Sequence, residues 1–282
     1  LVLILLFYFQ KHGTTKVGEV FGPVMVVWFI CLILLGIRGI LHYPRVLYAF
    51  NPWYAINFLT SQGMTAFLVL GGVFLCVTGA EALYADIGHF GKYPIRFTWF
   101  SFVFPALLIN YLGQGALIIE TPAAIGHPFY FLAPDWALYP LVVLATLATI
   151  IASQAIITAA FSLTRQALQL GYSPRMEVRH SSEQIIGQIY IPQINQILMI
   201  ATIGLVIGFR SSNNLAAAYG VAVSTTMVIT TLLAFSSLRR FWKMNIGIVG
   251  FIFTRFLGIE LAFFDSNIFK IWNGGWFPQL IA

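Results

Sequence analysis

The sequence consists largely of apolar runs of about 20 residues, separated by short segments in which most charged residues gather. A run of this length is what an α-helix needs to cross the hydrocarbon core of a bilayer. Charged residues make up 9% of the 282 residues, well below the roughly 25% typical of soluble domains. Because backbone polar groups in lipid must be paired within the chain, we expect an all-α polytopic membrane protein.

Seven complete spans are expected, at 21–40, 65–86, 97–119, 137–167, 194–209, about 215–235 and 246–264. Pro23 would lie near the start of the first span and Pro105 would kink the third. Residues 41–63 read as an interfacial segment with a short helix, and 168–192 as the largest loop. The apolar ends 1–9 and 275–282 are too short to span, so we expect a fragment.

Small and polar residues within the spans predict contacts between helices. Close packing is expected at the small residues of the fourth span, namely Ala152, Ser153, Ala155, Ala159 and Ala160. Asn110 and Gln114 are expected to bond helix to helix, and Arg255 and Glu260 to snorkel or bond between helices. Cys31 and Cys76 lie in apolar runs without metal-ligand spacing, which predicts buried thiols and no disulfide.

The distribution of Lys and Arg predicts the orientation in the membrane. These residues gather in the segments 10–20, 88–96, 165–192 and 237–245, whereas the opposite segments contain Glu120, Asp135 and Asp265 with few basic residues. By the positive-inside rule the first set is cytoplasmic. The formal charge of +6 therefore indicates topology, and no nucleic-acid partner is expected.

The stretch 71–91 departs from the pattern of a lipid-facing helix, because Thr78, Gly79 and Glu81 fall in mid-span. A carboxylate near the bilayer centre costs about 2–3 kcal/mol, and glycine weakens a helix by about 1 kcal/mol relative to alanine. A broken helix would free backbone carbonyls that bind a hard cation, which predicts an ion site at 77–81. The alternative is a structural Glu81 bonded to a neighbouring helix, with Gly79 as a close-packing position.

Long motifs in a fixed order cover essentially the whole chain: FQKHGTTKVGEVFGP, TGAEALYADIGHFGKYPIR, NYLGQGAL, LAPDWAL, IASQAII, FSLTRQALQLGY, SEQIIGQIYIP, NNLAAAYGVAVSTTM and NGGWFP. Together they resemble the bacterial potassium uptake permeases of the Kup/HAK/KT family. The resemblance implies an amino acid–polyamine–organocation (LeuT-like) fold of inverted repeats. Residues 1–282 would then be a transporter-domain fragment running from part of helix 4 to the start of helix 12, with the second inverted repeat at about 65–236.

The resemblance also implies an ion site. The family's acidic position in the broken helix matches Glu81, its hydroxyl matches Thr78, and a tyrosine of related transporters matches Tyr219. Potassium would bind through Thr78 and Glu81, helped by carbonyls around Val77 and Gly79. Glu81 is either an ion ligand or the carrier of a coupled proton, because desolvation favours a protonated carboxyl and a nearby cation reverses this preference.

We therefore expect secondary active potassium uptake across the inner membrane by proton–potassium symport, with no cofactor. The expected partners are potassium, protons and membrane lipid, and a homodimer is left open. An amino acid or other small-solute carrier of the same fold is the alternative. A channel lacks its repeated filter loop, and a membrane enzyme lacks motifs such as HExxH or GxSxG. A purely structural subunit is disfavoured by Glu81.

Overall fold

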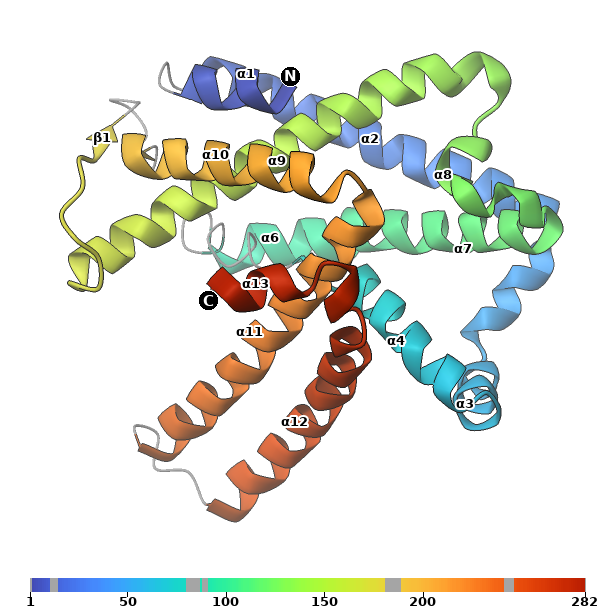
Figure 1. Ribbon diagram of the computed structural model, residues 1–282. Coiled ribbons are helices and arrows are strands. Elements are labelled where there is room, and N and C mark those ends of the chain that lie inside the picture. The colour runs from blue at the N-terminus through green and yellow to red at the C-terminus, as the bar shows by residue number, and fades with distance from the viewer. Residues whose placement is uncertain are drawn as a thin grey trace. The chain divides into compact units, whose positions relative to one another are not determined.

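A computed structural model describes residues 2–10, 15–79, 87, 91–180, 189–240 and 246–281. The chain divides into two compact units, which are described separately below (Figure 1). The first unit comprises Leu1–Asn51 and Ala80–Ala201, and the second comprises Pro52–Gly79 and Thr202–Ala282. Each unit is mostly helical, as the apolar runs predict.

The first unit contains long helices joined by short ones. Its long helices are α2 (Thr15–His42), α7 (Phe104–Glu120), α9 (Leu138–Gln169) and the first part of α10 (Pro192–Phe209). The shorter elements are α1 (Val2–Phe9), η2 (Pro44–Phe50), α6 (Lys92–Thr98), η3 (Trp99–Val103), η4 (Pro122–Gly126), α8 (Pro128–Phe131) and η5 (Asp135–Ala137). Two short strands, β1 (Arg179–His180) and β2 (Ile189–Tyr190), pair antiparallel within the expected loop.

Two prolines lie within the long helices of the first unit. Pro23 lies inside α2, because that helix begins at Thr15, so the prediction that Pro23 stands near the helix start is wrong. Before Pro105 the helix widens into the π-helical turn η3, where the Phe104 N–H donates to the carbonyl of Trp99, five residues earlier. A proline ring clashes with the carbonyl four residues before it. The wider turn accommodates that ring without ending the span.

Glycines bring α2 and α7 into close contact, and the two helices run side by side (Figure 1). A Cβ added at Gly36 would lie 2.5 Å from the Ile109 carbonyl oxygen, and one at Gly39 would lie 2.5 Å from that of Gly113. The buried Asn110 donates to the Leu32 carbonyl across this contact at 3.5 Å, which confirms its helix-to-helix role. Only glycine permits this approach of two backbones.

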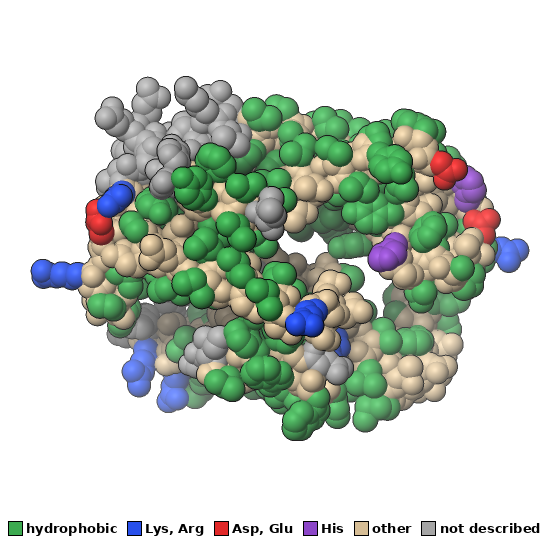
Figure 2. All heavy atoms as spheres, turned by 45° about the horizontal axis from the view of Figure 1, so that its top comes forward, with side chains coloured by type: hydrophobic (Ala, Val, Ile, Leu, Met, Phe, Trp, Pro, Cys, Tyr) green, Lys and Arg blue, Asp and Glu red, His purple; other side chains and the backbone are tan. Residues whose placement is uncertain are grey.

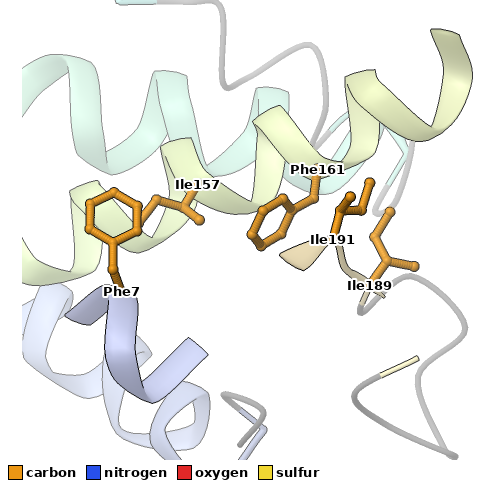
Figure 3. Close-up of a cluster of buried hydrophobic side chains, with 5 residues drawn as sticks. All are labelled: Phe7, Ile157, Phe161, Ile189 and Ile191. Carbon is orange, nitrogen blue, oxygen red and sulfur yellow. The ribbon is translucent and has the colours of Figure 1, made fainter. Parts of the chain in front are cut away.

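A second group of contacts in the first unit involves α9. Figure 3 shows Phe7 of α1 beside Ile157, and Phe161 beside Ile191 and Ile189 of the strand region. The buried Gln154 is hydrogen-bonded to Gln10, which follows α1. By contrast Ala152 and Ala155 are exposed, so the close packing expected there is not found at these two positions.

The second unit is built on a pair of adjacent helices, α11 (Ser212–Arg240) and α12 (Ile246–Ile268). The helix α4 (Met64–Val77) packs against both of them, and α3 (Pro52–Ser61) precedes it (Figure 1). A 3-10 turn η6 (Ile271–Asn273) and the short helix α13 (Trp276–Ile281) follow α12. The expected short helix within 41–63 corresponds to α3.

Five helices in the described part of the chain are long and apolar enough to cross a membrane. These are the segments Val20–His42, Lys92–Glu120, Asp135–Gln169, Pro192–Phe209 and Ser212–Arg240. Two of the seven expected spans are not among them: α4 has only 14 helical residues, and α12, with 23 residues, contains Arg255, Glu260 and Asp265. Figure 2 shows hydrophobic side chains over much of the visible face, as lipid contact requires.

Candidate functional site

The candidate site begins with the helix α4, whose sequence MTAFLVLGGVFLCV contains no charged residue. Phe74 is 1% exposed and its ring lies 5.3 Å from that of Phe263 on α12. Outward-facing side chains such as Leu68 and Val73 are apolar and exposed. One face of α4 is thus buried against α11 and α12, and its outer face is apolar, as expected for a helix in contact with lipid.

The helix stops abruptly inside the expected span. It ends at Val77, where Thr78 takes an extended conformation (φ −99°, ψ 174°), and Gly79 follows at φ +107°. Residues with a side chain rarely adopt the conformation of Gly79, so glycine is what allows the chain to turn here. The described helix therefore ends at the residues that the sequence singled out for the ion site.

The end of α4 presents acceptors that suit a cation. The last four carbonyls of a helix have no partner within it, and the negative end of the helix dipole lies at the same place. Thr78 Oγ1 donates to the Leu75 carbonyl at 3.3 Å, which places the hydroxyl on the last turn. Val77 is 70% exposed. These groups form an oxygen-rich helix end in an apolar segment.

The predicted carboxylate, Glu81, lies outside the described residues, as does the rest of 80–86. Of the predicted site residues the structure describes Val77, Thr78, Gly79 and Tyr219. The first three are contiguous at the end of α4. The role of Glu81 stays a prediction, and so do the roles of the other four.

The helix α11 brings Tyr219 to the neighbourhood of this helix end. A Cβ added at Gly220 would lie 3.6 Å from Leu75 Cδ2, so the backbone next to Tyr219 touches the last turn of α4. Tyr219 itself is 41% exposed. The structure thus brings the helix of the predicted tyrosine against the last turn of α4.

Sequence reasoning missed a group of polar residues on α12 that supports these helices. Ser266 and Asn267 are fully buried and belong to α12, although the expected span ends at 264. Asn267 packs against α11 so closely that a Cβ at Gly220 would lie 2.6 Å from its Oδ1. Its Nδ2 donates to the Phe263 carbonyl at 2.9 Å. The pairing of a glycine with a later asparagine is not visible in the sequence, because 47 residues separate the two positions.

Lys270 lies against the other side of this junction, beyond the end of α12. A Cβ at Gly71 of α4 would lie 2.7 Å from Lys270 Nζ, which donates to Asn267 Oδ1 at 3.5 Å. Partial burial lowers the pKa of the Lys270 ammonium. The Lys270 ammonium thus lies against α4 at Gly71 and beside the amide oxygen of Asn267.

Two further observations limit the chemistry of the described residues. No group of three or more His, Cys, Asp or Glu side chains among them lies in an arrangement that holds a metal ion. Cys76 is exposed on α4, so the expectation that both thiols are buried is wrong for this residue, while Cys31 is partly buried. A cavity of about 410 Å³ lies elsewhere in the second unit, between the end of α10, the start of α11 and the η6–α13 segment.

The family model described as the K+ potassium transporter integral membrane domain matches residues 1–282. A relative from Nitrosomonas eutropha named "Probable potassium transport system protein Kup" is 59% identical, and one of the same name from Chlorobium chlorochromatii is 56% identical. A relative from Sodalis glossinidius, named "Low affinity potassium transport system protein Kup", is 53% identical.

All three alignments cover 100% of this chain but only 44–45% of each relative, so the chain spans less than half the length of these relatives. No solved structure matches the chain. The five long apolar helices and the matched integral membrane domain define a multi-pass membrane protein. The chain belongs to the K+ potassium transporter family, which confirms the resemblance seen in its motifs.

Proposed function

We propose that this protein takes up potassium across the cytoplasmic membrane by secondary active transport, as a proton–potassium symporter. One observation carries most weight: in a member of this family, α4 ends at Val77 within an apolar segment and exposes its carbonyl end there. The names of the relatives favour potassium as the transported ion, and they give no support to an amino acid carrier.

The proposed ion site contains Val77, Thr78, Gly79, Glu81 and Tyr219. Potassium sheds its water only where several oxygens replace that water. Carbonyls at the end of α4 and the Thr78 hydroxyl would supply some of them, and the tyrosine hydroxyl another. The dipole of α4 favours a cation at its carbonyl end. Discontinuous helices that bind ions in this way occur in inverted-repeat transporters, the fold we propose, with a second repeat at about 65–236.

Glu81 is proposed as the residue that couples the proton to the potassium ion. Competition of the two cations for one carboxylate would exchange them in opposite directions. Symport instead requires both to be loaded from the same side. We therefore assign the proton to Glu81 and the potassium ion to the neutral oxygens around Thr78, with the protonated carboxyl favoured by an apolar setting.

The test is potassium uptake by a potassium-auxotrophic bacterium that expresses the complete reading frame containing this chain. Wild type and Glu81→Gln are compared at an acidic and a neutral external pH. We expect uptake that rises in acid for wild type and falls to the level of cells without the protein for Glu81→Gln. Glu177→Gln is the control, because Glu177 is an exposed carboxylate paired with Arg179 at 2.8 Å.

The outcomes separate the parts of the proposal. Retention of acid-stimulated uptake in Glu81→Gln would exclude the proton role of Glu81. Failure of wild type to restore growth, with the protein present in the membrane, would exclude potassium uptake. A loss of uptake in Glu177→Gln as large as that in Glu81→Gln would show that any lost carboxylate impairs the protein.

A further inference from the structure

The C-terminal end of α12 forms a polar junction with α4 and α11, the two helices that pack against it (Figure 1). Asn267 Oδ1 lies 2.6 Å from the position that a Cβ on Gly220 of α11 would take. Lys270 Nζ lies 2.7 Å from the corresponding position on Gly71 of α4. The two side chains meet, because Lys270 Nζ donates to Asn267 Oδ1 at 3.5 Å. One amide oxygen therefore joins a contact on α11 to a contact on α4.

The backbone around the junction holds both side chains in place. Asn267 Nδ2 donates to the Phe263 carbonyl at 2.9 Å, so the amide is fixed by its own helix. The Lys270 N–H donates to the Asn267 carbonyl at 2.8 Å, and the Lys270 carbonyl accepts from the Gly275 N–H at 3.3 Å. Hydrogen bonds on both sides of the lysine and to the amide thus define where the pair points.

The two glycines provide the space that the pair occupies. Gly71 and Gly220 are both buried within their helices. A glycine inside a helix costs about 1 kcal/mol relative to alanine. A methyl group at either position would displace Asn267 Oδ1 or Lys270 Nζ, whereas one at Gly72, the next residue of α4, would meet nothing within 4 Å. Gly71 and Gly72 therefore differ in what lies against them, although they are adjacent in the sequence.

The ammonium lies in a place that is unfavourable for a charge. Partial burial lowers the pKa of Lys270, because desolvation destabilises the charged form. A methionine side chain would fill similar space without this cost. A charge-assisted hydrogen bond to an amide oxygen is what a lysine adds and an apolar side chain cannot. The bond to Asn267 is therefore the contact that gives the lysine a role here.

The junction lies close to the potassium site proposed at the end of α4. Gly71 precedes Thr78 by seven residues, which is about two helical turns, or about 10 Å. On α11, Gly220 follows Tyr219 directly, and its Cβ position lies 3.6 Å from Leu75 Cδ2. The Leu75 carbonyl accepts the hydrogen bond from Thr78 Oγ1. Because α4 is a continuous helix from Met64 to Val77, a shift at the junction also moves its carbonyl end.

We propose that Asn267 and Lys270 are positioning residues of the potassium site, which hold the carbonyl end of α4 in place against α11. The inference rests on the proposed function, because that function places potassium at this helix end. Both residues act through backbone, Lys270 on α4 at Gly71 and Asn267 on α11 at Gly220. Loss of either side chain should weaken potassium binding while the helices remain.

Potassium uptake by the complete protein, measured over a range of external potassium concentrations, tests this inference. Groups that support an ion site from behind its ligands typically contribute about 10- to 100-fold to affinity. Asn267→Ala and Lys270→Met should therefore raise the half-saturating potassium concentration about tenfold or more. The maximal rate per molecule in the membrane should change much less. A purely structural role would reduce the amount of protein and leave the half-saturating concentration unchanged.

Gly71→Ala tests the same contact from the other helix. It displaces the ammonium without changing the lysine, because the nearest atom to the added Cβ is the end of a flexible side chain. The half-saturating concentration should rise in Gly71→Ala and stay at the wild-type value in the matched control Gly72→Ala. The same Cβ would lie 3.2 Å from the Ser266 carbonyl oxygen. The double variant Gly71→Ala/Lys270→Met separates the two contacts: if the lysine carries the effect, the second change adds little to the first.

Wild-type half-saturation in both Asn267→Ala and Lys270→Met would overturn the inference and leave the proposed function standing. Fold-changes of Gly71→Ala and Lys270→Met that multiply in full would also overturn it, because the two variants would then act through different contacts. If Lys270→Met does not reach the membrane, the comparison of Gly71→Ala with Gly72→Ala decides. A wild type that takes up no potassium would contradict the proposed function itself, and with it the site that these residues are proposed to position.

Discussion

At the scale of single residues, Gly79 decides where α4 ends. Its φ of +107° turns the chain directly after the extended Thr78, and an added Cβ would meet no atom within 4 Å. The requirement for glycine is therefore conformational and not steric. The sequence showed a glycine next to a threonine in mid-span, and α4 ends directly before these two residues.

Gly79→Ala is expected to destabilise the turn by about 1–3 kcal/mol, the cost of holding a residue with a side chain in a rarely populated backbone conformation. Because the turn belongs to the proposed ion site, the Gly79→Ala variant should also take up less potassium than wild type. Gly72→Ala is the matched control, because Gly72 is helical in α4 and also has nothing within 4 Å of its Cβ position. Equal potassium uptake by Gly79→Ala and Gly72→Ala would contradict the claim that the turn at Gly79 is needed for uptake.

Lys270 gives a prediction for pH dependence. Burial lowers its pKa in the folded protein, so between the folded and unfolded pKa values the unfolded chain binds more protons. Stability should therefore rise with pH as pH increases through this window below the ordinary lysine range. Lys270→Met should remove that slope in denaturation measurements, whereas the exposed Lys92→Met should keep it. An unchanged slope in Lys270→Met would exclude this lysine as its source.

At the scale of elements, apolar length predicted most helices to within a few residues. The expected 137–167 and 194–209 correspond to α9 at Leu138–Gln169 and α10 at Pro192–Phe209. What could not be predicted depends on contacts between distant segments. A close backbone approach lies at Gly36, Gly39 and Gly113, whereas Ala152 and Ala155 of α9, where the sequence predicted close packing, are exposed. A glycine in a helix looks the same whether or not another backbone touches it.

Gly113→Ala is expected to separate α2 from α7, because the added Cβ would lie 2.5 Å from Gly36 Cα, which belongs to the backbone and cannot move aside cheaply. The cost should be about 1–3 kcal/mol or more. Gly22→Ala in α2 should be neutral or stabilising by up to about 1 kcal/mol, because nothing lies within 4 Å of that position. Thermal unfolding in detergent measures both variants, and Gly113→Ala should melt at a lower temperature than Gly22→Ala. Equal melting temperatures would contradict the close contact between α2 and α7.

At the scale of the whole molecule, the sequence predicted a polytopic membrane protein and its family, both of which are confirmed. It did not show how polar residues far apart in the chain meet, as Thr231 and Glu260 do across 29 positions. Glu81 could be identified from its neighbours in the sequence, and its geometry lies outside the described residues. The orientation in the membrane stays a prediction from the distribution of Lys and Arg.

The two ends of α9 test that orientation. In a background without Cys31 and Cys76, single cysteines replace Trp136, which is 80% exposed before the helix, and Tyr172, which is 84% exposed after it. A membrane-impermeant maleimide applied to intact cells should label Trp136→Cys alone. In permeabilised cells it should label both Trp136→Cys and Tyr172→Cys. Labelling of Tyr172→Cys alone would invert the topology. Labelling of both in intact cells would mean that α9 does not cross the membrane.

The claim that potassium binds at the end of α4 is tested most directly by locating the ion. Crystals of the complete protein grown with rubidium would be measured for anomalous scattering, since rubidium replaces potassium with little change in size. We predict a peak within coordination distance of Thr78 Oγ1 and the carbonyl oxygens of Val77 and Thr78. A rubidium peak found only at another place in the membrane domain would contradict the site.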